Sequence, residues 1–155
     1  MKQNLRLISL IMVVMLLGAC ASLGIKNKQQ LMDYIDTAVL LTLDQEPASA
    51  EDISSIAQVV IDATNAAQTV TVSNLGTLVI DQLNIKNLTP IRKRLLEKLV
   101  NNLTGSLSQY FTDQKITEAK DQIVIVHDIA VMIQDDAATA RVQKYAQAKM
   151  KARTN

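Results

Sequence analysis

Few side chains in this sequence have the type and spacing needed for acid–base or metal chemistry. His127 is the only histidine, and its neighbours three and four positions away on a helix are Ile123, Val124, Ala130 and Val131. None of these apolar residues could orient an imidazole or share a metal ion with it. Common zinc motifs need a second histidine or paired cysteines, which the sequence lacks. We therefore expect a structural His127, and no catalytic residue, metal site or cofactor.

Two pairs of adjacent carboxylates, Glu51-Asp52 and Asp135-Asp136, are the remaining acid–base candidates. Adjacent residues on a helix point in different directions, so neither pair forms a matched acid and base about 5–9 Å apart. We interpret both pairs as helix-start residues, whose negative charge complements the helix dipole. Ser49 lies three residues before Asp52 and would complete a variant capping box.

Basic residues gather at two places that could contact an anionic surface. The first is Arg92-Lys93-Arg94 with Lys98, at a predicted helix start where positive charge opposes the dipole. The second is the C-terminal tail, which contains Arg141, Lys144, Lys149, Lys151 and Arg153. Lipid headgroups, lipopolysaccharide or wall polymer carboxylates are possible partners. Ordinary solvated helix faces are the simpler interpretation.

The only cysteine, Cys20, follows a short apolar run from Leu7 to Leu17 and a basic start at Lys2 and Arg6. This order of a charged region, a short apolar region and small residues is typical of an export signal. The apolar run is too short for a comfortable transmembrane helix, which needs about 20 residues. Cys20 also has no partner for an intramolecular disulfide.

Leu17-Gly18-Ala19-Cys20 resembles the lipobox of bacterial lipoproteins. The resemblance implies that residues 1–19 are a signal peptide cut before Cys20, and that Cys20 carries a diacylglycerol and becomes the acylated N-terminus. Ala21 follows Cys20, as in lipoproteins sorted to the outer membrane of enteric-type bacteria. We therefore expect a lipid-anchored protein of the bacterial cell membrane, on the periplasmic face of the outer membrane in a Gram-negative host.

Length and composition favour one exported helical domain. Removing residues 1–19 from the 155-residue chain leaves 136 residues, which suits a single domain. Without Lys2 and Arg6, the 16 basic residues fall to 14 against 15 acidic ones, so bulk charge gives no reason to expect nucleic-acid binding. Four glycines and two prolines argue against a loop-rich or all-β fold.

Hydrophobic periodicity predicts most of the helices directly. We expect residues 20–30 to form the lipidated cysteine and a tether, and residues 31–155 to form a single helical domain with a frayed basic C-terminus.

Apolar residues recur at three and four positions over 28–43 and 53–67, which predicts two helices. Pro47 ends the first of them. Thr89-Pro90 starts a third, which ends near Asp113.

Two stretches are harder to assign. Residues 69–80 read either as a short helix capped by Ser73, which we favour, or as a β-hairpin. The last helix starts near Ile116, and its apolar run over 122–134 predicts the central, most buried element. The sequence thus predicts an all-α protein, a small bundle of four to six helices.

These features together predict an envelope lipoprotein that acts as a non-enzymatic protein-binding or accessory factor. It resembles the pilotins of secretins and the exclusion lipoproteins of phages and plasmids in size, lipobox and helix content alone, so no functional residue carries over. An apolar groove between helices would favour such binding. One alternative is a wall- or lipid-active envelope enzyme, with His127 or the paired carboxylates in a cleft. Another is a structural spacer, which the absence of sustained heptads disfavours.

Overall fold

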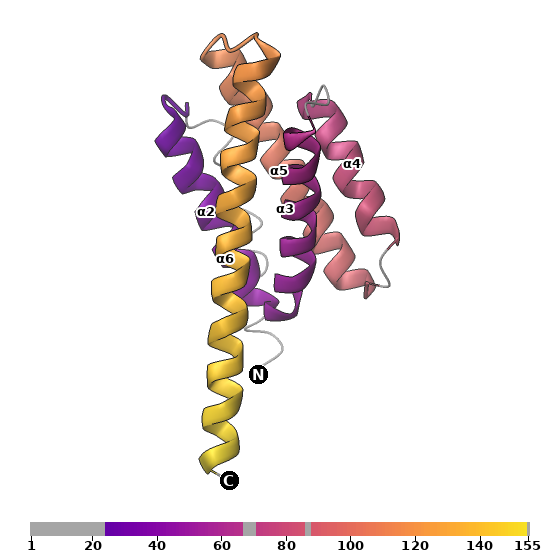
Figure 1. Ribbon diagram of the computed structural model, residues 1–155, viewed down its shortest axis with the longest axis vertical. Helices are drawn as coiled ribbons and strands as arrows, with labels where there is room; N and C mark the ends of the chain where they lie inside the picture. The colour runs from indigo at the N-terminus through magenta and orange to yellow at the C-terminus, as the bar shows by residue number, and fades with distance from the viewer. Residues whose placement is uncertain (1–23, 67–70, 86–87, 155) are drawn as a thin grey trace.

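The computed structural model describes residues 24–66, 71–85 and 88–154, and in these segments the chain is all-helical (Figure 1). The elements are α2 (Lys28–Gln45), the short 3-10 helix η2 (Pro47–Ser49), α3 (Ala50–Asn65), α4 (Val72–Ile85), α5 (Pro90–Asp113) and α6 (Ala119–Thr154). The predicted small all-α bundle is confirmed. The hairpin alternative over 69–80 is wrong, because residues 72–80 belong to α4; residues 69 and 70 lie outside the described segments.

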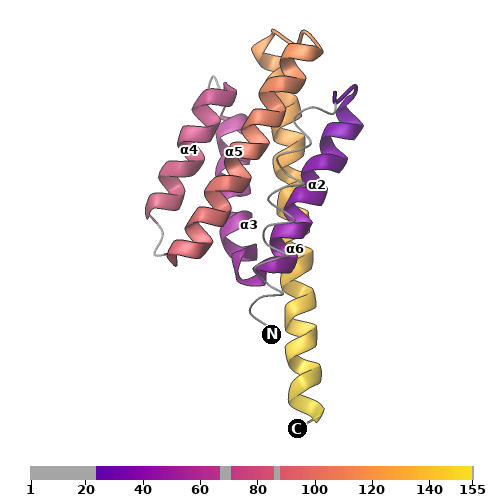
Figure 2. The same ribbon diagram turned by 180° about the vertical axis from the view of Figure 1, so that it is seen from behind.

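The longest helix, α6, packs against α3 and α2, while α4 packs mainly against α5 (Figures 1 and 2). Aliphatic side chains fill the space between the helices, and Leu31, Ile35 and Val39 of α2 are completely buried. The prediction that α6 is buried on every side over 122–134 is wrong. Val124 is 57% exposed and Val131 is 38% exposed. α3 and α2 cover one side of α6, and its other side faces solvent.

The helix starts show which short polar residues act as caps. Asn27 caps α2, because its side chain accepts a hydrogen bond from the backbone N–H of Gln30 at 2.9 Å. Thr89 caps α5 in the same way, as the Thr-Pro pair predicted. At α4 the cap is Thr71 rather than Ser73, since the Thr71 hydroxyl accepts from Asn74 N at 3.3 Å.

The predicted capping box at Ser49 does not form. The preceding 3-10 turn gives Ser49 helical dihedral angles, φ −77° and ψ −9°, and its hydroxyl makes no capping hydrogen bond. A capping residue normally has extended dihedral angles, which let its side chain reach back to the first turn. The Ser49 Oγ is instead fully buried without a hydrogen-bond partner.

α6 runs without interruption through Asp135 and Asp136. These two residues lie in the middle of a 36-residue helix, so the prediction that they mark a helix start is wrong. The true start follows a tight turn after α5, in which Lys115 adopts a positive φ of 54°. Ile116 N donates to Phe111 O at 2.9 Å across this turn, which satisfies a carbonyl at the end of α5.

Candidate functional site

The structure has an aliphatic groove between α3, α4, α5 and α6. Its empty volume, counted out to the open solvent, is about 630 Å³. Sixteen residues line it: Ile53, Ile56, Ala57 and Val60 of α3, Leu75 and Val79 of α4, Leu96, Leu99, Val100, Leu103, Thr104 and Leu107 of α5, and Val126, Ile129, Ala130 and Ile133 of α6. We call this set the aliphatic groove.

The groove follows from how the helices pair. α6 packs closely on α3, and α5 packs on α4 and α2, but α5 and α6 make little contact with each other. Their aliphatic faces therefore lie on two sides of an opening. α4 packs less extensively against α3 than it packs against α5. The opening therefore remains accessible from solvent between α3 and α4.

The groove offers almost no polar chemistry. Thr104 is its only polar lining residue, and the Thr104 hydroxyl already lies within hydrogen-bond distance of Val100 O at 3.0 Å and Asn101 O at 3.1 Å. No titratable side chain lines the groove. It is therefore suited to a hydrocarbon surface and provides no acid, base or metal ligand.

His127 lies away from the groove lining and is half-buried between α6 and α3. Its Nδ1 is 2.9 Å from the Oγ1 of Thr64. The Thr64 hydroxyl also lies 2.9 Å from Val60 O and 2.8 Å from Ile61 O, to which it can donate its single proton. Nδ1 and Oγ1 therefore lie at hydrogen-bond distance across the interface between α6 and α3. This arrangement connects two helices, as expected for a structural histidine.

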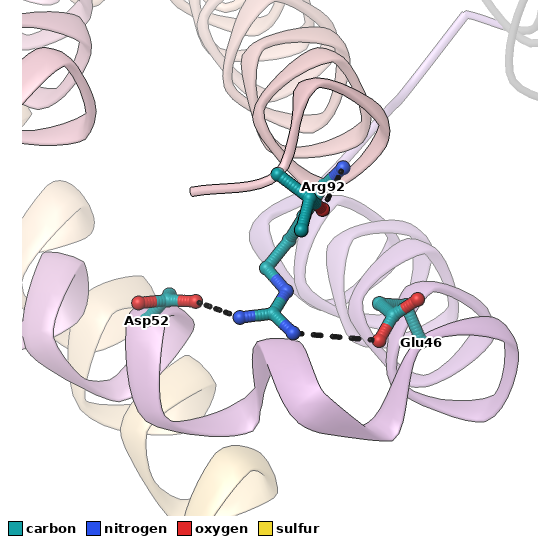
Figure 3. Close-up of polar contacts among 4 residues, drawn as sticks. Glu46, Asp52 and Arg92 are labelled. Carbon is teal, nitrogen blue, oxygen red and sulfur yellow. Dashed lines mark hydrogen bonds and ion pairs between the residues drawn. The ribbon is translucent and has the colours of Figure 1, made fainter. Parts of the chain in front are cut away.

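The acidic pairs are separated by the fold and do not meet in a cleft. Asp52 is 9% exposed and faces the guanidinium of Arg92, with Nη1 3.7 Å from Oδ2 (Figure 3). The other amino group of Arg92, Nη2, lies 3.8 Å from Glu46 Oε1. Asp52 lies in the first turn of α3, as predicted, and also contributes to a contact between α3 and α5.

Asp136 meets a carboxylate that the sequence analysis did not consider, Asp36 of α2. The pKa of Asp136 is raised from 3.8 to about 6. Burial is the largest cause, followed by a side-chain hydrogen bond with Asp36 and the negative charges of Asp36 and Asp135. The raised pKa means that the Asp136 carboxyl of α6 holds a proton below about pH 6, beside Asp36 of α2.

The predicted basic cluster at the start of α5 is divided by the structure. Arg92 faces Glu46 and Asp52 inside the bundle, and Lys93 lies 3.9 Å from Glu97 within α5. Arg94 is exposed. Arg92 and Lys93 therefore have acidic partners within the protein, whereas Arg94 faces solvent. The second basic cluster lies at the free end of α6, and Arg141 and Lys144 are exposed there.

Cys20 lies outside the described residues, so the structure carries no statement about it. None of the helices in the described segments is both long enough and apolar enough to cross a membrane. In the same segments, no three histidine, cysteine, aspartate or glutamate side chains gather in a way that could hold a metal ion.

Comparison with protein-family models, curated proteins and solved structures finds no match for this chain. The geometry and the sequence are therefore the basis for a functional proposal.

Proposed function

We propose that the protein is a lipid-anchored envelope lipoprotein that acts as a non-enzymatic accessory factor and binds a helix of a protein partner in its aliphatic groove. The groove is the observation that carries the binding role. The lipobox of Leu17-Gly18-Ala19-Cys20 supports the anchor and the envelope location. The absence of titratable side chains from the groove lining favours binding over catalysis.

The chemistry of the groove favours a helix as the bound segment. An extended peptide would bring backbone N–H and C=O groups into a site that has no free polar partner for them, which costs free energy. A helix satisfies these groups internally and presents only side chains. Aliphatic residues repeating at three and four positions on such a helix would fill the groove.

A photo-crosslinking experiment tests this binding role. Benzoylphenylalanine is introduced at Leu103, which lines the groove and is half-buried, and separately at Ser108, an exposed residue of the same helix outside the lining. We expect ultraviolet irradiation of cells to crosslink one partner from position 103 and not from position 108. Peptide mapping should place the crosslink on a helix with an aliphatic face.

A charged side chain in the groove provides the matching loss-of-function test. Thr104→Asp puts a carboxylate among aliphatic side chains, whereas Ser108→Asp adds the same charge at an exposed site. We expect Thr104→Asp to abolish the crosslink from position 103 and Ser108→Asp to leave it unchanged. Equal crosslinking from positions 103 and 108, or a crosslink insensitive to Thr104→Asp, would overturn the proposal.

A further inference from the structure

The C-terminal part of α6 extends beyond the rest of the bundle (Figures 1 and 2). Among the residues of α6 whose exposure the structure describes, Ala137 is the last that is completely buried, and Arg141, Val142 and Lys144 are exposed. We call residues 141–154 the α6 arm. At about 1.5 Å per residue, the arm is roughly 20 Å long. Residues 141–144 and 146, whose exposure the structure describes, all face solvent.

The arm carries charge of one sign only. It contains five basic residues and no acidic one, and no acidic residue follows Asp136. Arg141 and Lys144 are three positions apart, and Lys149 and Arg153 are four apart, so each pair falls on neighbouring positions of one helix face. Like charges at these spacings destabilise an isolated helix. A negatively charged partner would convert this repulsion into attraction.

The pattern of the arm disfavours insertion into a bilayer surface. A helix lying in a membrane interface needs a continuous apolar face opposite its basic face. In the arm, the larger apolar residues Val142, Tyr145 and Met150 alternate around the helix with the basic positions. The arm is therefore suited to electrostatic contact with a flexible anionic chain, which can follow charges distributed around a helix.

The arm and the first described residues of the chain lie at opposite ends of the bundle. The carbonyl of Ile25 accepts a hydrogen bond from Gln114 Nε2 at 3.5 Å, and Lys28 forms an ion pair with Asp128, so the described chain begins beside the turn between α5 and α6. From Asp128, the 26 residues to Thr154 extend about 39 Å along the helix. Cys20, five residues before Ile25, can lie at most about 18 Å from it.

From these observations we infer that the α6 arm binds a polyanionic polymer, recognised through its repeated phosphate or carboxylate groups, on the side of the bundle away from the anchoring bilayer. The position relative to the bilayer rests on the proposed lipid anchor at Cys20. The binding of the polymer rests on the arm alone. The protein would then connect a membrane to an anionic polymer.

The test uses the full mature protein, isolated with its native N-terminus and mixed with neutral phosphatidylcholine vesicles. Binding of fluorescent polyglutamate and of inorganic polyphosphate is measured as a function of salt. A variant replaces the five basic residues of the arm by Gln. The control replaces five basic residues outside the arm by Gln: Lys26, Arg94, Lys98, Lys115 and Lys120. We expect binding that weakens as salt rises, and an affinity at least about tenfold lower in the arm variant than in the control.

Flotation of the vesicles separates failure of the anchor from failure of the arm. Protein that binds polymer but does not float with the vesicles contradicts the lipid anchor and leaves the arm assignment intact. Protein that floats but binds neither polymer overturns the arm assignment. Equal polymer affinity in the arm variant and the control also overturns the arm assignment. A wild-type protein that binds vesicles containing phosphatidylglycerol more tightly than either polymer overturns it as well.

Discussion

His127 Nδ1 on α6 lies 2.9 Å from Thr64 Oγ1 on α3, so the only histidine of the chain forms a contact between the two most extensively packed helices. The Thr64 hydroxyl is also within hydrogen-bond distance of two carbonyls of its own helix. The imidazole thereby contacts α3 across the helix interface. This arrangement gives His127 a structural role that can be measured.

Thr64→Val should lower the free energy of unfolding by about 1 kcal/mol, because it removes the hydrogen bond to His127 at nearly constant volume. Thr42→Val is the matched control. Thr42 is also buried, but its hydroxyl bonds only to the carbonyl of Ala38 within its own helix. Urea unfolding of the two variants measures the difference. Equal losses would show that the contact to His127 contributes nothing.

Arg92→Met should destabilise the protein by about 1–2 kcal/mol, because it leaves the buried carboxylate of Asp52 without its nearby guanidinium (Figure 3). Arg94→Met removes the same charge from an exposed position and should change stability by less than about 0.5 kcal/mol. Thermal unfolding compares the two variants. Adding Asp52→Asn to Arg92→Met should restore part of the lost stability, because it removes the charge that Arg92 compensates. A further loss of stability would argue against the pairing of Arg92 with Asp52.

Asp136→Asn tests the raised pKa of Asp136 beside Asp36. The pKa of Asp136 in the folded protein is about 6, above its ordinary value of 3.8, so the protonated form favours folding. This stabilisation is complete below about pH 4 and is lost as the pH rises through 6. The variant should therefore match wild type near pH 4 and exceed its stability above pH 6, by about 1 kcal/mol after allowance for partial exposure.

Asp135→Asn is the control for this pH dependence, because Asp135 is exposed on the same helix. We expect its stability difference from wild type to change much less between pH 4 and pH 7. The measurement is the free energy of unfolding of wild type and both variants between pH 4 and pH 7. A constant difference between Asp136→Asn and wild type at every pH would contradict the raised pKa.

Gly105→Ala should stabilise the protein by up to about 1 kcal/mol. Gly105 lies in the interior of α5, where Ala has a higher helix propensity than Gly. A Cβ atom at this position would meet no other atom within 4 Å, so no steric cost opposes the gain. The midpoint of thermal unfolding should rise. A fall would indicate that the helix needs the freedom of glycine here.

Val126→Ala and Val124→Ala test which side of α6 faces the core. Val126 is 2% exposed, and its truncation should cost about 2 kcal/mol through lost burial and a cavity. Val124 is 57% exposed, and the same truncation should change stability by less than about 0.5 kcal/mol. Similar losses at both positions would contradict the observed orientation of the helix.

Several helices of the fold, although not the caps expected at Ser49 and Ser73, were predictable from the sequence because they depend on neighbouring residues. The apolar spacing over 28–43 and the Thr89-Pro90 pair correspond to α2 and α5, whose caps and lengths are set locally. The orientation of α6 was not predictable in this way. An apolar run over 122–134 shows that the segment can be buried, but the packing partners decide which side is covered.

The candidate site depends on contacts between distant segments, which periodicity does not reveal. The aliphatic groove combines residues of four helices, and each of its members alone looks like an ordinary core position. The contact between Asp36 and Asp136 joins residues 100 positions apart. Arg92 was predicted to be available to an anionic partner, because the sequence does not show that Asp52 and Glu46 approach it.

The mass of the mature N-terminus tests the anchored-lipoprotein account most directly. Protein isolated from its native envelope is digested, and the peptide that begins at Cys20 is measured by mass spectrometry. For an anchored lipoprotein, we expect a chain that starts at Cys20 and carries a thioether-linked diacylglycerol. A bare Cys20 thiol, or a chain that retains residues 1–19, would contradict it.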